Sequence, residues 1–209
     1  MTGQSDQEII DSVSAALDTA MELAAEEEGW EVSKEQEGAV VKTKKNKEGR
    51  RVWLCSATVN VSAGVLWEKL SDTDNLTSWN NTLTTSKIIK SLSPDVKVTY
   101  QITSEGGGGV VSARDFVYGC KTLIKDKKKM IGGLSVTLED QPEVGGVVRA
   151  SHGPGLQIVE DIGEADRCKF VWLMDCDYRG MIPTSIIEIA MPNAQLQVQF
   201  FSFSSLNFK

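Results

Sequence analysis

The chain has 209 residues, of which 41% are hydrophobic and 24% are charged, and its formal net charge is −7. This composition is too apolar for disorder, and the length suits one domain, since domains usually contain about 100–200 residues. The acidic balance argues against nucleic acid as a partner, because phosphate contacts need a basic face. No run approaches the ~20 consecutive apolar residues of a membrane span, and the first residues do not resemble a secretory signal. We expect a single domain over 1–209 in a monomeric, cytoplasmic protein.

The residues that usually hold metals are few and scattered. The four cysteines, Cys55, Cys120, Cys168 and Cys176, show neither the close pairing of a zinc site nor the density of a disulfide framework. His152 is the only histidine, which excludes sites built from several histidines. We expect reduced cysteines, no metal and no cofactor, and for His152 a structural hydrogen bond.

The chain begins with an amphipathic helix over residues 5–28, in which apolar side chains recur at helical spacing. Ser5 and Glu8 have the spacing of a capping box, in which each side chain bonds a free backbone amide at the helix start. Gly29 suits the end of this helix.

Short β-rich runs dominate the middle of the chain. We expect strands at 30–33, 39–43, 51–61, 83–90, 96–104, 114–125, 130–138, 146–152, 155–160 and 168–177, a turn at 34–38, and helices at 62–70 and 181–200. Most strands should pair antiparallel, because the links are too short for parallel crossovers. The fold class is therefore α+β, and a ligand is one answer to what fills the space between a curved sheet and the last helix. Pro192 should bend that helix, with or without a role in opening it.

Catalytic interpretations are weak. The run from Gly106 to Gly109 lacks the G-K-[ST] of a phosphate-binding loop. Asp175 and Asp177 share one face of a strand, as acid and base pairs do, but the adjacent Arg179 favours a structural ion pair. A hydrolase using these two carboxylates is the enzymatic alternative.

Three motifs carry a resemblance to a known family. They are S-A-R-D-F-V at 112–117, G-G-V-V-R-A-S-H-G-P at 145–154 and D-Y-R-G-M-I-P at 177–183, with support from W-N at 79–80 and S-I-I at 185–187. Their order and spacing resemble the steroidogenic acute regulatory protein-related lipid transfer domain. The resemblance implies a helix-grip fold, in which a curved antiparallel sheet wraps around a long C-terminal helix that acts as the lid of a lipid tunnel.

The same resemblance implies non-enzymatic binding and intracellular transfer of one apolar lipid, with transient contact to membranes. A sterol is the first expectation and a carotenoid the alternative, while a lipid-sensing module without transfer is an alternative of another class. The basic clusters at 42–51 and 121–129 either touch anionic lipid or are solvated turns. The terminal FFSFSSLNFK departs from the family and favours helix poorly, so its Phe side chains are candidates for contact with a membrane or partner.

Site residues follow from the resemblance combined with periodicity. Sterol-carrying relatives place an acidic residue and an arginine on facing strands of the tunnel, and Gln101 and Cys120 occupy those positions here. We therefore expect a neutral tunnel. Strand alternation, the family position of a tunnel aromatic, and helical spacing give the expected lining as Thr99, Gln101, Thr103, Phe116, Tyr118, Cys120, Trp172, Ile187, Met191, Ala194 and Val198.

Overall fold

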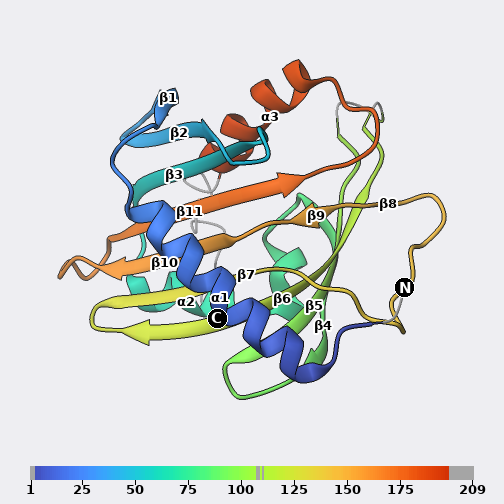
Figure 1. Cartoon of the computed structure of the whole chain (residues 1–209). Coiled ribbons are helices and arrows are strands. Elements are labelled where there is room, and N and C mark those ends of the chain that lie inside the picture. The colour runs from blue at the N-terminus through green and yellow to red at the C-terminus, as the bar shows by residue number, and fades with distance from the viewer. Residues whose placement is uncertain (1–2, 107–108, 110, 198–209) are drawn as a thin grey trace.

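The computed structural model describes residues 3–106, 109 and 111–197 (Figure 1). Its strands are β1 (Glu31–Gln36), β2 (Ala39–Lys45), β3 (Arg51–Val59), β4 (Leu83–Ser91), β5 (Val96–Thr103), β6 (Arg114–Lys125), β7 (Lys128–Ser135), β8 (Val148–Arg149), β9 (Ser151–His152), β10 (Gly155–Asp161) and β11 (Cys168–Asp177). They form one sheet in the order β1-β2-β3-β11-β10-β7-β6-β5-β4, with β8 on β6 and β9 on β11. All pairs are antiparallel except β6 with β8, which confirms the expected pairing.

The helix α1 (Asp6–Ala25) packs across one face of the sheet, over β6, β7 and β10. The expected capping box is present, since Ser5 Oγ accepts from the Glu8 amide and the Glu8 carboxylate accepts from the Ser5 amide. Glycines let the helix lie close to the strands. A Cβ atom at Gly119 would lie 2.6 Å from Val13 Cγ2, and one at Gly132 would lie 2.6 Å from Leu17 Cδ1. We call the face under α1 the outer face.

The turn between β1 and β2 is shorter than expected. We predicted a turn over residues 34–38, but β1 extends to Gln36 and only Glu37 and Gly38 remain in the turn. Both have positive φ, 49° and 82°, as a two-residue hairpin of type I′ requires. The tight turn leaves more residues paired in the strands.

The remaining helices lie after β3 and at the end of the described chain. They are α2 (Ala63–Ser71), the 3-10 helix η1 (Thr73–Ser78) and α3 (Thr184–Gln197). Helix α3 packs on β1, β2 and β3, on the sheet face opposite α1, and Pro192 lies buried inside it. The helix expected over 181–200 begins at Thr184 instead, and its residues 198–200 lie outside the described residues, as does FFSFSSLNFK. No helix in the described part of the chain is both long and apolar enough to span a membrane.

The three sequence motifs meet in space. Arg114 Nε lies 3.3 Å from the carbonyl oxygen of Tyr178 and Nη2 lies 3.4 Å from that of Arg179, so the first motif holds the third. Asp115 accepts hydrogen bonds from Arg149 Nε at 3.0 Å and Nη2 at 2.8 Å, which joins the first motif to the second. These contacts fix the chain where it leaves β11 for α3.

Candidate functional site

The face opposite α1, here the inner face, carries the residues that alternation predicted. Val98, Tyr100 and Val117 pack with Ile9 and Val13 of α1, so their neighbours along β5 and β6 point the other way. The inner face therefore receives Thr99, Gln101, Thr103, Phe116, Tyr118 and Cys120.

Trp172 and α3 come together on the inner face. Ile187 and Met191 pack in one apolar cluster with Trp53, and Trp172 borders that cluster. Trp172 also borders a second cluster, which includes Leu66 of α2. Ala194 is half-buried on α3, and Val198 lies outside the described residues.

Several polar side chains of the inner face already have partners within the protein. The Thr99 hydroxyl donates to the Tyr118 carbonyl at 3.2 Å, and the Thr103 hydroxyl accepts from the Arg114 amide at 3.0 Å. Gln101 Nε2 donates to Ser86 Oγ at 3.4 Å. Within the described residues, Gln101 Oε1 has no hydrogen-bond partner. Gln101 is thus the member of this group with an acceptor left for a ligand.

The strand register does not place Gln101 and Cys120 against each other. Gln101 is opposite Phe116, and Cys120 is opposite Lys97. At ~3.3 Å per residue, four register positions separate the two side chains by about 13 Å along the strands. The two side chains share the inner face of neighbouring strands without lying directly opposite each other. Their correspondence to the ion-pair positions of sterol-carrying relatives stays a prediction. Lys97 also adds a half-buried cation at this end of an inner face that we expected to be neutral.

Sequence reasoning missed three further residues of the inner face. His152 Nδ1 donates to the Gly153 carbonyl at 2.9 Å, and its ring centroid lies 5.2 Å from that of Tyr118. The Tyr178 hydroxyl lies 2.9 Å from Met191 Sδ, joining the segment before α3 to the helix. Gln195 of α3 has no exposed surface, and its Nε2 donates to the Trp172 carbonyl at 3.2 Å. Helical spacing from Ile187 and Met191 would have identified Gln195, but its polarity kept it out of an apolar pattern.

Burial keeps the titratable groups of this face uncharged. It raises the pKa of Cys120 to about 11 and that of Cys176 to about 12, and it raises the pKa of Tyr118. It lowers the pKa of His152 below its ordinary value of 6.5. At neutral pH these four side chains carry no charge, so the middle of the inner face has low polarity.

The apolar packing on the inner face is divided. One cluster lies under α3, one under α2, and a third contains Phe116, Ala150 and Cys176. Between them, Tyr118, Ile131 and Trp172 remain half-buried. These side chains offer aromatic and aliphatic surface that the protein itself does not fully cover.

The carboxylates considered for hydrolysis both bond groups within the protein. Asp175 is buried and accepts from Arg50 Nε at 2.6 Å and from Asn46 Nδ2 at 3.1 Å. Asp177 accepts from the backbone amide of Arg179 at 3.0 Å. An ion pair was expected, but Arg50, on the segment just before β3, provides it in place of the adjacent arginine. The described residues contain no group of His, Cys, Asp and Glu side chains that fits a metal ion.

Comparison with known proteins agrees with this architecture. The chain matches the START domain over residues 10–206. It belongs to the START-domain family. The mitochondrial steroidogenic acute regulatory protein of Mus musculus is 27% identical over 198 residues, covering 92% of this chain and 70% of the relative. The Bos taurus protein is 28% identical over 201 residues, which cover 94% of this chain and 70% of the relative.

Solved structures show the same fold at lower sequence identity. Human StAR-related lipid transfer protein 5 superposes with a TM-score of 0.87 at 17% identity, covering 92% of this chain and 93% of that chain. Human STARD10 superposes with a TM-score of 0.73 at 18% identity, covering 91% of this chain and 82% of that chain. The helix-grip fold expected from the sequence is confirmed.

Proposed function

We propose that this START-domain protein binds one apolar lipid between α3 and the inner face and transfers it between membranes without chemical reaction. The observation that carries the proposal is the half-buried, uncharged surface around Trp172 and Tyr118, bordered by α3. Such a surface suits an apolar body, and the few polar groups beside it suit one hydroxyl or carbonyl. The names of the relatives, which refer to steroid production and lipid transfer, support a lipid ligand, with a sterol first and a carotenoid second.

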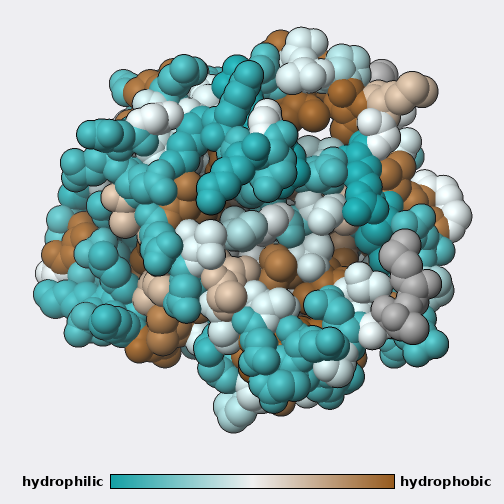
Figure 2. Space-filling view, viewed as in Figure 1, coloured by the Kyte–Doolittle hydropathy of each residue, from teal (hydrophilic) through white to brown (hydrophobic). Residues whose placement is uncertain are grey.

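Membrane contact is part of this proposal. Met181 is fully exposed just before α3, and Ile186 and Ile189 are exposed on the helix, with Ile189 at 68%. Figure 2 shows brown apolar atoms among the hydrophilic surface near the position of α3. Exposed apolar side chains beside a ligand site suit brief contact with a bilayer. We infer that the protein works in the cytoplasm, at membrane surfaces.

The first experiment identifies the ligand. Protein purified from cells is extracted and the lipid is measured by mass spectrometry, then purified protein is tested for vesicle-to-vesicle transfer of cholesterol. A stoichiometric apolar lipid together with transfer supports the proposal. A bound lipid without transfer indicates a sensing module, and turnover of a lipid that is lost in Asp175→Asn indicates an enzyme.

Trp172 is the side chain that we expect to matter most for affinity. Its indole lies between the α2 and α3 clusters, and losing a large aromatic contact removes about 1.5–3 kcal/mol of binding, roughly tenfold to a hundredfold. Trp172→Ala should therefore weaken cholesterol binding by at least about tenfold. Trp30→Ala, on the outer face, is the matched control. Unchanged affinity in a folded Trp172→Ala protein would remove Trp172 from the site.

A further inference from the structure

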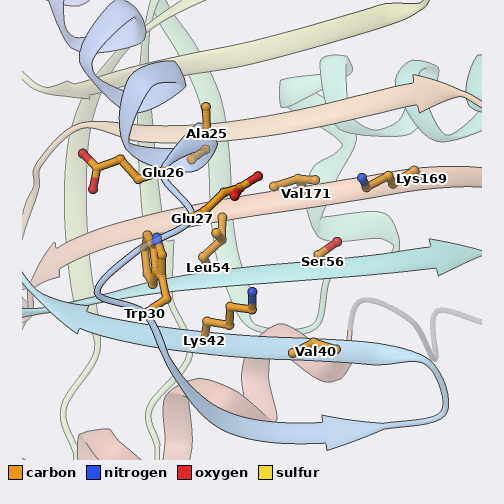
Figure 3. A pocket seen from close by; sticks show the side chains of 11 residues that line it. Ala25, Glu26, Glu27, Trp30, Val40, Lys42, Leu54, Ser56, Lys169 and Val171 are labelled. Carbon is orange, nitrogen blue, oxygen red and sulfur yellow. The ribbon is translucent and has the colours of Figure 1, made fainter.

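A cavity of about 480 Å³ lies on the outer face of the sheet, where α1 ends (Figure 3). Helix α1 covers β6, β7 and β10. Beyond its last residue, Ala25, the helix leaves the outer-face side chains of β2, β3 and β11 uncovered. Leu54 and Val171 form the apolar floor, and Trp30 closes one side. Both floor residues also pack in the apolar cluster under α1, so the floor continues the core of the protein.

Two lysines reach into this cavity from different strands. Lys42 extends from β2 and Lys169 from β11, and Figure 3 shows their side chains extending toward the floor from different sides. In the part of the chain that the structure describes, neither ammonium group has an ion-pair or hydrogen-bond partner. Lys44 on the same face of β2 differs, because it pairs with Glu26 and lies 4.6 Å from the Trp30 ring centroid.

Two further polar groups line the space. The Ser56 side chain points from β3 and makes no hydrogen bond within the described residues. Glu27 extends from the segment after α1 toward Val171 (Figure 3). Since Glu26 is neutralised by Lys44, the single charge of Glu27 against those of Lys42 and Lys169 leaves one net positive charge at the cavity.

We propose that this cavity binds an amphipathic monoanion, a molecule with one carboxylate and a flat apolar body. The carboxylate accepts charge-assisted hydrogen bonds from Lys42 and Lys169, while the body packs on Leu54, Val171 and Trp30. The carboxylate of Glu27 selects against ligands with several negative charges. The volume lies within the ~300–1,000 Å³ of small-molecule sites.

This site is separate from the proposed lipid site. Strand alternation puts Leu54 and Val171 on the outer face, whereas their neighbours Cys55 and Trp172 face α3. The proposal therefore does not depend on the lipid that the inner face holds. The test uses a small probe molecule, and the measurement shows whether the probe binds on the outer face or on the inner face.

The probe is naphthalene-2-carboxylate, with naphthalene-2-methanol as its uncharged match, titrated into the full chain at low ionic strength by calorimetry. We expect the carboxylate to bind roughly tenfold more tightly than the alcohol, as two charge-assisted contacts imply. Lys42→Gln with Lys169→Gln should remove that preference and leave binding of the alcohol unchanged. Lys125→Gln with Lys127→Gln, which removes two exposed charges from the β6–β7 turn, should behave as wild type.

Amide NMR shifts locate the probe. We expect changes at Val40, Ser56 and Val171 rather than at Thr99 and Gln101, and Ser56→Phe, which fills the cavity, should abolish them. The proposal is overturned if the carboxylate does not bind, if the Lys42/Lys169 double variant binds it as wild type does, or if the shifts fall on the inner face.

Discussion

The ion pair between Asp115 and Arg149 shows what one buried residue contributes. Asp115 has no exposed surface, and besides Arg149 it accepts from the Tyr100 hydroxyl at 3.0 Å. The hydrogen bond to Asp115 raises the pKa of Arg149. Arg149 also donates to the carbonyls of Gln141 and Pro142, so it fixes the loop before β8. The motifs that suggested the family thus include residues that hold the fold rather than the ligand.

We predict that Asp115→Asn lowers the free energy of unfolding by about 3–5 kcal/mol, because it leaves the half-buried Arg149 guanidinium without its counter-charge. Urea denaturation followed by circular dichroism measures this. Asp6→Asn is the control, since its ion pair with Lys90 is exposed and should contribute less than about 1 kcal/mol. Equal losses in the two variants would contradict the structural role of Asp115.

His152 should make stability depend on pH. Burial lowers its pKa, so below pH 6.5 the unfolded chain binds a proton that the folded protein does not. The free energy of unfolding should fall as the pH drops below 6.5, until the folded pKa is reached, with a slope from this residue of up to about 1.4 kcal/mol per pH unit. Comparison of wild type with His152→Gln between neutral and mildly acidic pH isolates the contribution. Parallel profiles for the two proteins would show that His152 is not shielded from solvent.

At the scale of elements, α3 is held to the sheet by few polar contacts. Glu188 accepts from Arg51 Nε of β3 at 2.6 Å, Asn193 accepts from Lys34 of β1, and Gln195 donates to β11. The first pair is partly exposed on both sides, so it contributes little to stability. Apolar packing of Met191 and Leu196 against β2 and β3 therefore provides much of the contact between α3 and the sheet.

If α3 is the lid of the site, tethering it to the sheet should slow ligand exchange much more than it changes equilibrium affinity, since opening would limit the rate. Lys34→Cys with Asn193→Cys, joined by a short bis-maleimide, provides the tether, because the four native cysteines are buried. Stopped-flow exchange of a fluorescent sterol is measured before and after joining. Exchange as fast in the joined protein would place ligand entry elsewhere.

Sequence patterns predicted the elements better than their relative positions. The strands β5, β6, β10 and β11 begin where periodicity placed them, and alternation identified which side chains share the inner face. The offset of Gln101 from Cys120 was not predictable in this way, because register depends on how each hairpin closes and not on the alternation of one strand. The ion-pair partner of Asp175 was not predictable either. The adjacent Arg179 was expected, but the partner is Arg50, which is distant in the chain and lies on the segment before β3.

Across the whole molecule, the two faces of one sheet differ in the polar groups that they carry. The middle of the inner face holds neutral polar groups, whereas the open part of the outer face carries Lys42 and Lys169. These two lysines lie on β2 and β11, whereas the charged residue of β3 that contacts α3 is Arg51, which pairs with Glu188. This arrangement favours a ligand without charge on the inner face.

The polarity of the inner face predicts weak selectivity for a sterol hydroxyl. Gln101 Oε1 can accept one hydrogen bond from a hydroxyl, and a neutral bond of this kind contributes about 0.5–1.5 kcal/mol, a factor of roughly two to twelve. Cholesterol should therefore bind less than about twelvefold more tightly than cholest-4-en-3-one in a competition assay. Gln101→Leu should bring the two affinities together, while Gln7→Leu, on the exposed side of α1 and away from the inner face, serves as the control. A wild-type preference of a hundredfold or more would require a charged or multiply bonded hydroxyl partner, which Gln101 alone does not provide.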